Sequence, residues 1–321
     1  MSIPQAIEER LLLPVMVAPM FLCSSVDLVS ESCKAGLIGT LTRNHCRSDD
    51  EFEGQVAEVR NRLAAFEENN PGKVAGPLAA NISVNEMPDA RRAALETCRR
   101  HSVDIVVTAG GDPTAMAAMV HDWGGRIFHD VTAIRFAEKA IAAGVDGVIA
   151  IGAGGGGHSG VLSHLSFVPQ LRAMFDGTIV AAGAIASGAA IRAMEILGAD
   201  LVYMGTRFIA TQESMAFDEY KEMLVSQMPA DLVYTAAVNG VPAMWMLESM
   251  RRNGVQVEAL LSGSLPASEA IPADVTPWRN LWSAGQGVGL IHDIPHVAEL
   301  AERLRDEYAC AVNLPCTYPL R

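Results

Sequence analysis

Short apolar runs alternate with longer amphipathic stretches over about the first 210 residues. The runs lie at residues 13–17, 37–40, 76–82, 103–108, 126–128, 147–151, 178–182 and 201–204. Continuous apolar runs of this kind are typical of parallel strands that are buried on both faces and joined by crossover helices. Eight of them predict an α/β fold, specifically a closed (β/α)8 TIM barrel.

The stretches between these runs have the spacing of helices. Between Asp49 and Asn69, apolar residues recur three or four positions apart, which places them on one face of a helix. We expect further helices over residues 133–143 and, close to the end of the chain, over residues 294–308.

The alternation stops after Thr206. We expect residues 211–280 to form a smaller, mostly helical insertion or cap domain, and residues 1–210 and 281–321 to form the barrel with its closing segment. The methionines near this insertion are Met215, Met223, Met228, Met244, Met246 and Met250. A stripe of methionines is either adaptable packing or part of a cofactor pocket, and packing is the more common case.

The composition excludes several classes of partner. Half of the 321 residues are apolar, and the net charge of −13 repels the phosphates of nucleic acids and anionic lipids. The longest apolar stretch, Leu11 to Cys23, contains two prolines and is shorter than the roughly 20 residues that cross a bilayer. We therefore expect a cytoplasmic protein with a small-molecule substrate and no nucleic-acid or membrane partner, and leave a homodimer open.

The six cysteines form no C-x-x-C pair. This spacing predicts neither a zinc ribbon nor a thioredoxin motif, so we expect no metal site. Reduced and mostly buried thiols are the simpler interpretation.

The excess of glycine falls in one place. The chain has 28 glycines, against about 22 at an average usage of about 7%, and six lie within residues 152–160, directly after the sixth predicted strand. At the carboxyl end of a barrel strand, such a run lets the backbone approach a ligand closely. His158 lies in this run, as a general base or substrate-orienting residue, or as a loop histidine in solvent. A dinucleotide fingerprint is disfavoured, because no acidic residue ends the next strand.

Two further strand ends are built from small residues. Ala182-Gly183-Ala184 follows the seventh predicted strand, and Gly205-Thr206-Arg207 follows the eighth. In TIM barrels these two loops commonly bind a phosphate, so they predict a phosphate-bearing cofactor; the alternative is that they only begin helices. Asn81 ends the third strand, where it is either a partner for a planar heterocycle or an ordinary polar residue of the barrel mouth.

In their order along the chain, these strand ends resemble the nitronate monooxygenase (2-nitropropane dioxygenase-like) family. The resemblance rests on residues 14–20, 76–81 and 108–113, on Gly-Gly-His-Ser-Gly at 156–160, on Ala-Gly-Ala at 182–184, on Met-Gly-Thr-Arg-Phe at 204–208, and on the closing segments 282–285 and 289–293. NADH:quinone reductases and flavin-type enoyl-acyl-carrier-protein reductases share part of this pattern.

The resemblance implies FMN, bound non-covalently at the carboxyl-terminal mouth of the barrel. His158 falls on the family's active-site histidine, which would take the α-proton of a neutral nitroalkane or orient a nitronate. The implied partners of the ring system are Pro19, Met20 and Phe21, with Asn81 and Ser83 near its edge. The implied partners of the phosphate and ribityl chain are Gly156, Ala182, Gly183, Ala184, Gly205 and Thr206, and Gly157 and Asp130 complete the implied cofactor site.

Two positions depart from the family's pattern. Asp130 stands where several relatives have a lysine, and Gly152-Ala153-Gly154-Gly155 stands where many have Glu-Ala. A carboxylate disfavours an anionic reduced flavin, whereas a lysine would stabilise it.

Three activities are open at this point. The first is FMN-dependent oxidation of alkyl nitronates, formed from nitroalkanes, with dioxygen to a carbonyl compound and nitrite. In the second, NAD(P)H reduces the FMN, and a quinone or an enoyl thioester accepts the electrons. The third is a flavin-free barrel, such as a lyase or isomerase, that binds a phosphate-bearing ligand.

Overall fold

Eight parallel strands form the centre of the protein. The computed structural model describes residues 3–314, and its main sheet has the order β1-β9-β8-β6-β5-β4-β3-β2. The strands are β1 (Val15–Val17), β2 (Gly39–Thr42), β3 (Leu78–Ser83), β4 (Ile105–Ala109), β5 (Arg126–Val131), β6 (Gly147–Ile151), β8 (Thr178–Ala182) and β9 (Leu201–Met204). The N–H of Val17 donates to the carbonyl of Ile38 (2.8 Å), and the N–H of Ile38 donates to Val15 (3.0 Å). These bonds join the two edges of the sheet, so the predicted (β/α)8 TIM barrel is confirmed.

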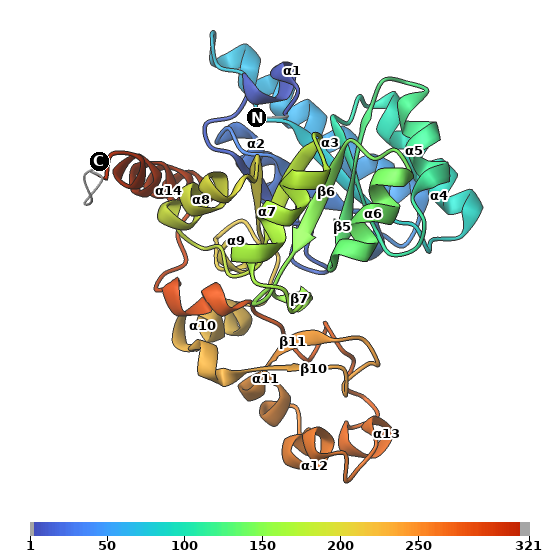
Figure 1. The fold of residues 1–321 in the computed structure, drawn as a ribbon, viewed down its shortest axis with the longest axis vertical. Coiled ribbons are helices and arrows are strands. Elements are labelled where there is room, and N and C mark those ends of the chain that lie inside the picture. The colour runs from blue at the N-terminus through green and yellow to red at the C-terminus, as the bar shows by residue number, and fades with distance from the viewer. Residues whose placement is uncertain (1–2, 315–321) are drawn as a thin grey trace.

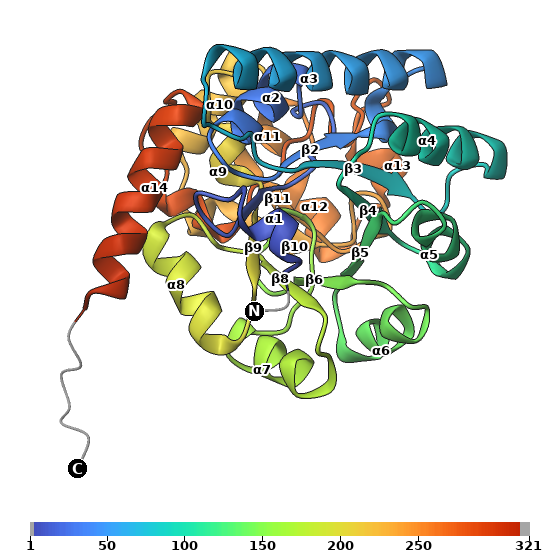
Figure 2. The same ribbon diagram turned by 90° about the horizontal axis from the view of Figure 1, so that it is seen from above.

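Helices surround the barrel, as the view along its axis shows (Figure 2). They are α2 (Val26–Lys34), α3 (Asp49–Asn69), α4 (Pro88–Arg100), α5 (Thr114–His121), α6 (Ile134–Ala142), α7 (His164–Met174), α8 (Gly188–Leu197) and α14 (Val297–Val312). The helix predicted from Asp49 to Asn69 is confirmed with those bounds. The last helix begins at Val297, three residues later than predicted, and packs beside α8 and α2.

The core has two layers. One apolar layer fills the space between the strands and the surrounding helices, and a smaller one fills the inside of the barrel. The short helix α1 (Gln5–Glu8) adds Ile7 to the inner layer and covers the amino-terminal end of the barrel. Because that end is plugged by apolar side chains, only the opposite end is left for a ligand.

The segment after β9 and the short α9 (Thr206–Ile209) extends from the carboxyl-terminal end of the barrel (Figure 1). It contains α10 (Asp218–Ser226), β10 (Leu232–Thr235), β11 (Ala243–Met246), α11 (Leu247–Arg252), α12 (Val257–Ser262) and α13 (Ala267–Ala270). The sequence did not predict the two strands; for β11, Ala-Met-Trp-Met is as compatible with a buried helix as with a strand. The division of the chain into a barrel and a cap domain stays a prediction.

The insertion's second strand connects it to the glycine-rich run. β7 (Gly157–His158) pairs with β11 in antiparallel register, with Ala243 opposite His158 and Met244 opposite Gly157. The histidine predicted as a loop residue therefore lies on a short strand, held by the insertion.

Four of the six methionines near the insertion are buried. Met223 and Met246 lie in one apolar cluster and Met250 in another, and Met244 is buried. Met215 and Met228 are exposed.

Four of the cysteines are buried free thiols, at positions 23, 33, 46 and 98, and Cys310 is exposed. Cys316 lies outside the described residues. Within residues 3–314, no helix has the length and apolar character needed to span a membrane.

Candidate functional site

A cavity of about 530 Å³ opens at the carboxyl-terminal end of the barrel, between the strand ends and the insertion. This volume is in the usual range of small-molecule sites, roughly 300–1,000 Å³. From the barrel, its walls include Ala18, Pro19, Met20, Phe21, Asp130, Ile151, the backbone of residues 155–157 and 182–186, Tyr203, Gly205 and Thr206. From the insertion and closing segment, they include Tyr220, Trp278, Leu281, Trp282, Ser283 and Gly285.

Most of the residues predicted for the cofactor site come together around this cavity. Those that line it are Pro19, Met20, Phe21, Asp130, Gly156, Gly157, His158, Ala182, Gly183, Ala184, Gly205 and Thr206. Asn81 and Ser83 are outside its lining. The amide of Asn81 donates to the carbonyl of Val107 (3.4 Å), and the hydroxyl of Ser83 accepts from the N–H of Asn85 (3.2 Å). Asn81 thus bonds to the neighbouring strand β4, and Ser83 bonds to the turn that follows its own strand.

The glycines of the run after β6 allow two backbones to touch. A Cβ atom at Gly156 would lie 2.8 Å from the backbone nitrogen of Gly285, and one at Gly285 would lie 2.8 Å from the carbonyl oxygen of Gly154. The N–H of Gln286 also donates to the carbonyl of Gly154 (2.8 Å). The run therefore needs glycine to pack against the closing segment, in addition to facing the cavity.

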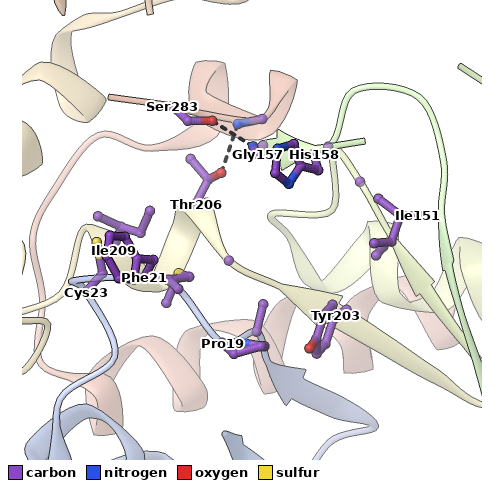
Figure 3. A pocket seen from close by; sticks show the side chains of 18 of the residues that line it. Pro19, Phe21, Cys23, Ile151, Gly157, His158, Tyr203, Thr206, Ile209 and Ser283 are labelled. Carbon is purple, nitrogen blue, oxygen red and sulfur yellow. Dashed lines mark hydrogen bonds between the residues drawn. The ribbon is translucent and has the colours of Figure 1, made fainter. Parts of the chain in front are cut away.

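The side chain of Ser283 forms hydrogen bonds to both the glycine run and the insertion. Its hydroxyl donates to the carbonyl of Met244 (2.5 Å) and accepts from the N–H of Gly157 (2.6 Å). Its own carbonyl accepts a hydrogen bond from the buried hydroxyl of Tyr220. Figure 3 shows Ser283 directly beside Gly157 and His158. One side chain of the closing segment thereby joins the glycine run to the insertion.

His158 is exposed and faces an aromatic wall. Its ring packs edge-on against Trp278, with ring centroids 5.1 Å apart, and Trp278 lies against the fully buried Trp245 at 4.3 Å. Trp278 has a left-handed backbone, with φ of +68°, a conformation that is rare for a bulky residue and concentrates at functional sites. Partial desolvation lowers the pKa of His158 below its ordinary value of 6.5. A neutral imidazole near pH 7 can accept a proton.

The first of the two predicted phosphate loops, after β8, presents backbone donors. The N–H groups of Gly183 and Ala184 bond to no acceptor among residues 3–314. Both residues have left-handed backbones, with φ of +120° and +57°. His164 supports this loop, since its Nε2 atom lies 3.1 Å from the carbonyl oxygen of Gly183. The loop can therefore accept an anion through its backbone.

Arg207, in the predicted phosphate loop after β9, binds the closing segment. The guanidinium of Arg207 is buried and bonds to the carboxylate of Asp293 (2.8 Å) and to the carbonyl of Ala210 (3.4 Å). The hydroxyl of Thr206 accepts from the N–H of Gly285 (2.9 Å). This loop thus binds the closing segment through its side chains, and the bare backbone of Gly205 lines the cavity.

Several residues that line the cavity were not predicted as site residues from the sequence. Tyr203 lies inside an apolar strand, and its hydroxyl was the only available signal of a role beyond packing. Tyr220, Trp278 and Ser283 reach the cavity only through the folding of the insertion. For Trp282 and Ser283, the family-like closing segment was the one signal at hand.

Comparisons with known proteins show what the chain is similar to. A model of the family described as nitronate monooxygenase matches residues 7–307. A probable nitronate monooxygenase of Staphylococcus saprophyticus is 38% identical over 177 residues, covering 48% of this chain and 49% of the relative. A Mycobacterium tuberculosis protein named (3aS,4S,5R,7aS)-5-hydroxy-7a-methyl-1-oxo-octahydro-1H-indene-4-carboxyl-CoA dehydrogenase is 27% identical over 254 residues, covering 78% of this chain and 66% of the relative. The chain spans about half of the length of the first curated relatives it matches.

Solved structures share the whole architecture. FabK of Thermotoga maritima matches with a TM-score of 0.76 and 27% identity, covering 97% of both chains. The nitroalkane oxidase of Streptomyces ansochromogenes matches with a TM-score of 0.76 and 23% identity, covering 96% of this chain and 99% of that one. At that level of identity, the second likeness is one of fold.

Proposed function

The chain belongs to the nitronate monooxygenase family, and from this membership we propose that it binds FMN in the cavity and oxidises alkyl nitronates with dioxygen to a carbonyl compound and nitrite. Membership of the family makes it an oxidoreductase. The single observation that carries the specific proposal is the position of His158, an exposed histidine beside a cavity whose wall is formed in part by the backbone of glycines.

The residues present fit a flavin. The cavity has an apolar wall for a ring system in Pro19, Met20 and Ile151, and a loop with free N–H groups at Gly183 and Ala184 for a phosphate. It also has buried polar atoms without partners, the Asp130 Oδ1 and the Tyr203 hydroxyl. Buried polar groups are normally hydrogen-bonded, so these two atoms favour a ligand with polar edges.

The chain's own residues then have distinct roles. Gly183, Ala184 and Gly205 hold the phosphate end through their backbone. His158 takes the α-proton of a neutral nitroalkane onto its ring, or orients a nitronate that is already ionised. Trp278 limits where that imidazole can turn and covers the substrate from water. When bound, the flavin supplies the electron acceptor, chemistry that no side chain offers.

A second candidate is an NAD(P)H-dependent FMN reductase acting on enoyl thioesters or quinones. One observation favours it: a relative matched over 78% of this chain is named as a dehydrogenase of a coenzyme A thioester. Trp278, Leu281 and Trp282 also line the cavity, and their apolar side chains could pack against an apolar acyl chain.

The proposal is tested with the purified full chain. Heat release and chromatography should identify its pigment as FMN, and aerobic incubation with propyl 3-nitronate should yield nitrite with consumption of dioxygen. A colourless protein that does not bind added FMN would contradict the cofactor assignment. FMN-loaded protein that gives no nitrite, yet oxidises NADH in the presence of a quinone or enoyl thioester, would favour the second candidate.

A further inference from the structure

Two polar side chains lie near each other at the floor of the cavity, the half-buried Asp130 and the buried Tyr203. Asp130 comes from β5 and Tyr203 from β9, and both line the cavity. Tyr203 is 8% exposed and lies across the cavity from Ser283 (Figure 3). The Oδ1 atom of Asp130 and the hydroxyl of Tyr203 have no hydrogen-bond partner among the described residues. Buried polar groups are normally hydrogen-bonded, so both atoms are suited to a polar ligand.

Nothing on the cavity wall compensates a negative charge at Asp130. Among the described residues that line the cavity there is no lysine or arginine. The ionisable side chains that face it are Cys23, His158, Tyr203 and Tyr220. The flanking strands β4 and β6 carry no ionisable side chain, and the helices packed against the outside of β5 carry His121, Arg135, Glu138 and Lys139.

Desolvation by burial is therefore the one effect that shifts the pKa of this carboxyl group. Desolvation raises the pKa of Asp130 to about 7. The pKa of Tyr203 is raised well above its ordinary value, by burial and by the neighbouring Asp130. His129, the adjacent residue on β5, faces away from the cavity and bonds to Thr108 (2.8 Å). A ring that covers Asp130 removes further solvent and favours the neutral acid more strongly.

We propose that Asp130 meets the bound flavin as a neutral carboxylic acid, with the Tyr203 hydroxyl beside it, so that FMN binding above neutral pH takes up one proton. This inference rests on the proposed flavin site, and it adds that the carboxyl group of Asp130 in that site is uncharged. The proton comes from solvent and joins the carboxylate oxygen of Asp130, and no other bond changes. The site would then differ from one with a lysine here, because it offers the flavin a neutral donor in place of a positive charge.

Calorimetry measures this proton directly. The full chain, stripped of flavin, is titrated with FMN at about pH 8 in two buffers of different ionisation enthalpy. The FMN phosphate is already doubly ionised there, since a phosphate's second pKa is about 6. We expect an uptake close to one proton per FMN, and an FMN dissociation constant that rises about tenfold per pH unit above neutrality. Asp130→Asn should take up none and bind with a flat pH profile, while Asp122→Asn, at an exposed carboxylate after α5, should behave like the unaltered chain.

The outcomes separate this inference from the proposed function. FMN binding without proton uptake by the unaltered chain, or equal uptake by Asp130→Asn, overturns the inference and leaves the flavin site standing. Failure of the unaltered chain to bind FMN overturns both. If Asp130→Asn does not fold, the unaltered chain's proton count and pH profile still decide the question. Tyr203→Phe adds a second variant, which should weaken FMN binding several-fold and keep the uptake.

Discussion

The hydroxyl of Ser283 accepts a 2.6 Å hydrogen bond from the N–H of Gly157, the residue directly before His158. The same hydroxyl donates to the carbonyl of Met244 on β11. A residue more than a hundred positions away in sequence thus fixes the short strand that carries the candidate base. The position of His158 depends on the insertion as much as on the barrel.

Replacing Ser283 with alanine should loosen this strand. Ser283→Ala leaves the buried carbonyl of Met244 and the N–H of Gly157 without their shared partner, and we expect a loss of about 1–3 kcal/mol in the free energy of unfolding. Amide exchange at Gly157 should become faster. Ser166→Ala, at an exposed serine of α7, is the control and should stay within about 0.5 kcal/mol. Unchanged exchange at Gly157 in Ser283→Ala would show that the hydroxyl does not hold the strand.

Bulk at Gly205 should displace the cofactor. A Cβ atom there would meet Ala18 and Met20 at an ordinary 3.5 Å, so the barrel tolerates a side chain while the cavity loses space. We expect Gly205→Val to fold and to bind FMN at least tenfold more weakly by fluorescence titration. Gly183 is a poorer test, because its φ of +120° strains any side chain.

The matched control for this variant is Gly54→Val. Gly54 is exposed on α3, and a Cβ atom there would meet nothing within 4 Å. The control should bind FMN like the unaltered chain. Full FMN occupancy in Gly205→Val would show that the cofactor lies elsewhere.

Removing the imidazole of His158 should slow the turnover of neutral nitroalkanes far more than that of preformed nitronates. A positioned general base contributes about 10²- to 10⁴-fold in rate. We therefore expect His158→Ala to keep its FMN, to lose turnover of neutral nitroalkanes by a factor in that range, and to lose far less with preformed nitronates. Initial rates of nitrite release measure both. Equal losses on the two substrates would contradict the role of a base.

The pH profile gives an independent check on His158. Because desolvation lowers its pKa below 6.5, the imidazole is neutral and able to accept a proton at pH 7. The value of kcat/KM for a neutral nitroalkane should stay high at pH 7 and fall only as the pH drops through the lowered pKa. An acid limb with a midpoint above 6.5 would indicate a different base.

Much of the barrel could be predicted from the sequence, because its strands are buried on both faces and stand out as apolar runs. The end of β5 could not be predicted. His129 and Asp130 interrupt the apolar pattern, so the sequence predicts a strand that stops at Phe128, whereas β5 continues to Val131. Asp130 was placed in the cofactor site by resemblance, while its position on a strand inside the barrel mouth needed the structure.

The candidate site was predictable where it belongs to strand ends, since these meet at one end of a barrel whatever their sequence separation. Residues 155–158 of the glycine run line the cavity, but the sequence did not predict the packing of Gly156 on Gly285, because this is a contact between distant segments. Trp278 and Ser283 could not be placed for the same reason. They reach His158 only after β7 pairs with β11.

We propose that a nitronate, and not a nicotinamide nucleotide, reduces the flavin of this protein. Anaerobic rapid mixing of the FMN-loaded chain with propyl 3-nitronate, NADH and NADPH in parallel, followed by the absorbance of the oxidised flavin, distinguishes these electron donors. We expect rapid bleaching by the nitronate and none within seconds by either nucleotide. Bleaching by NADH or NADPH, with no response to the nitronate, would contradict it.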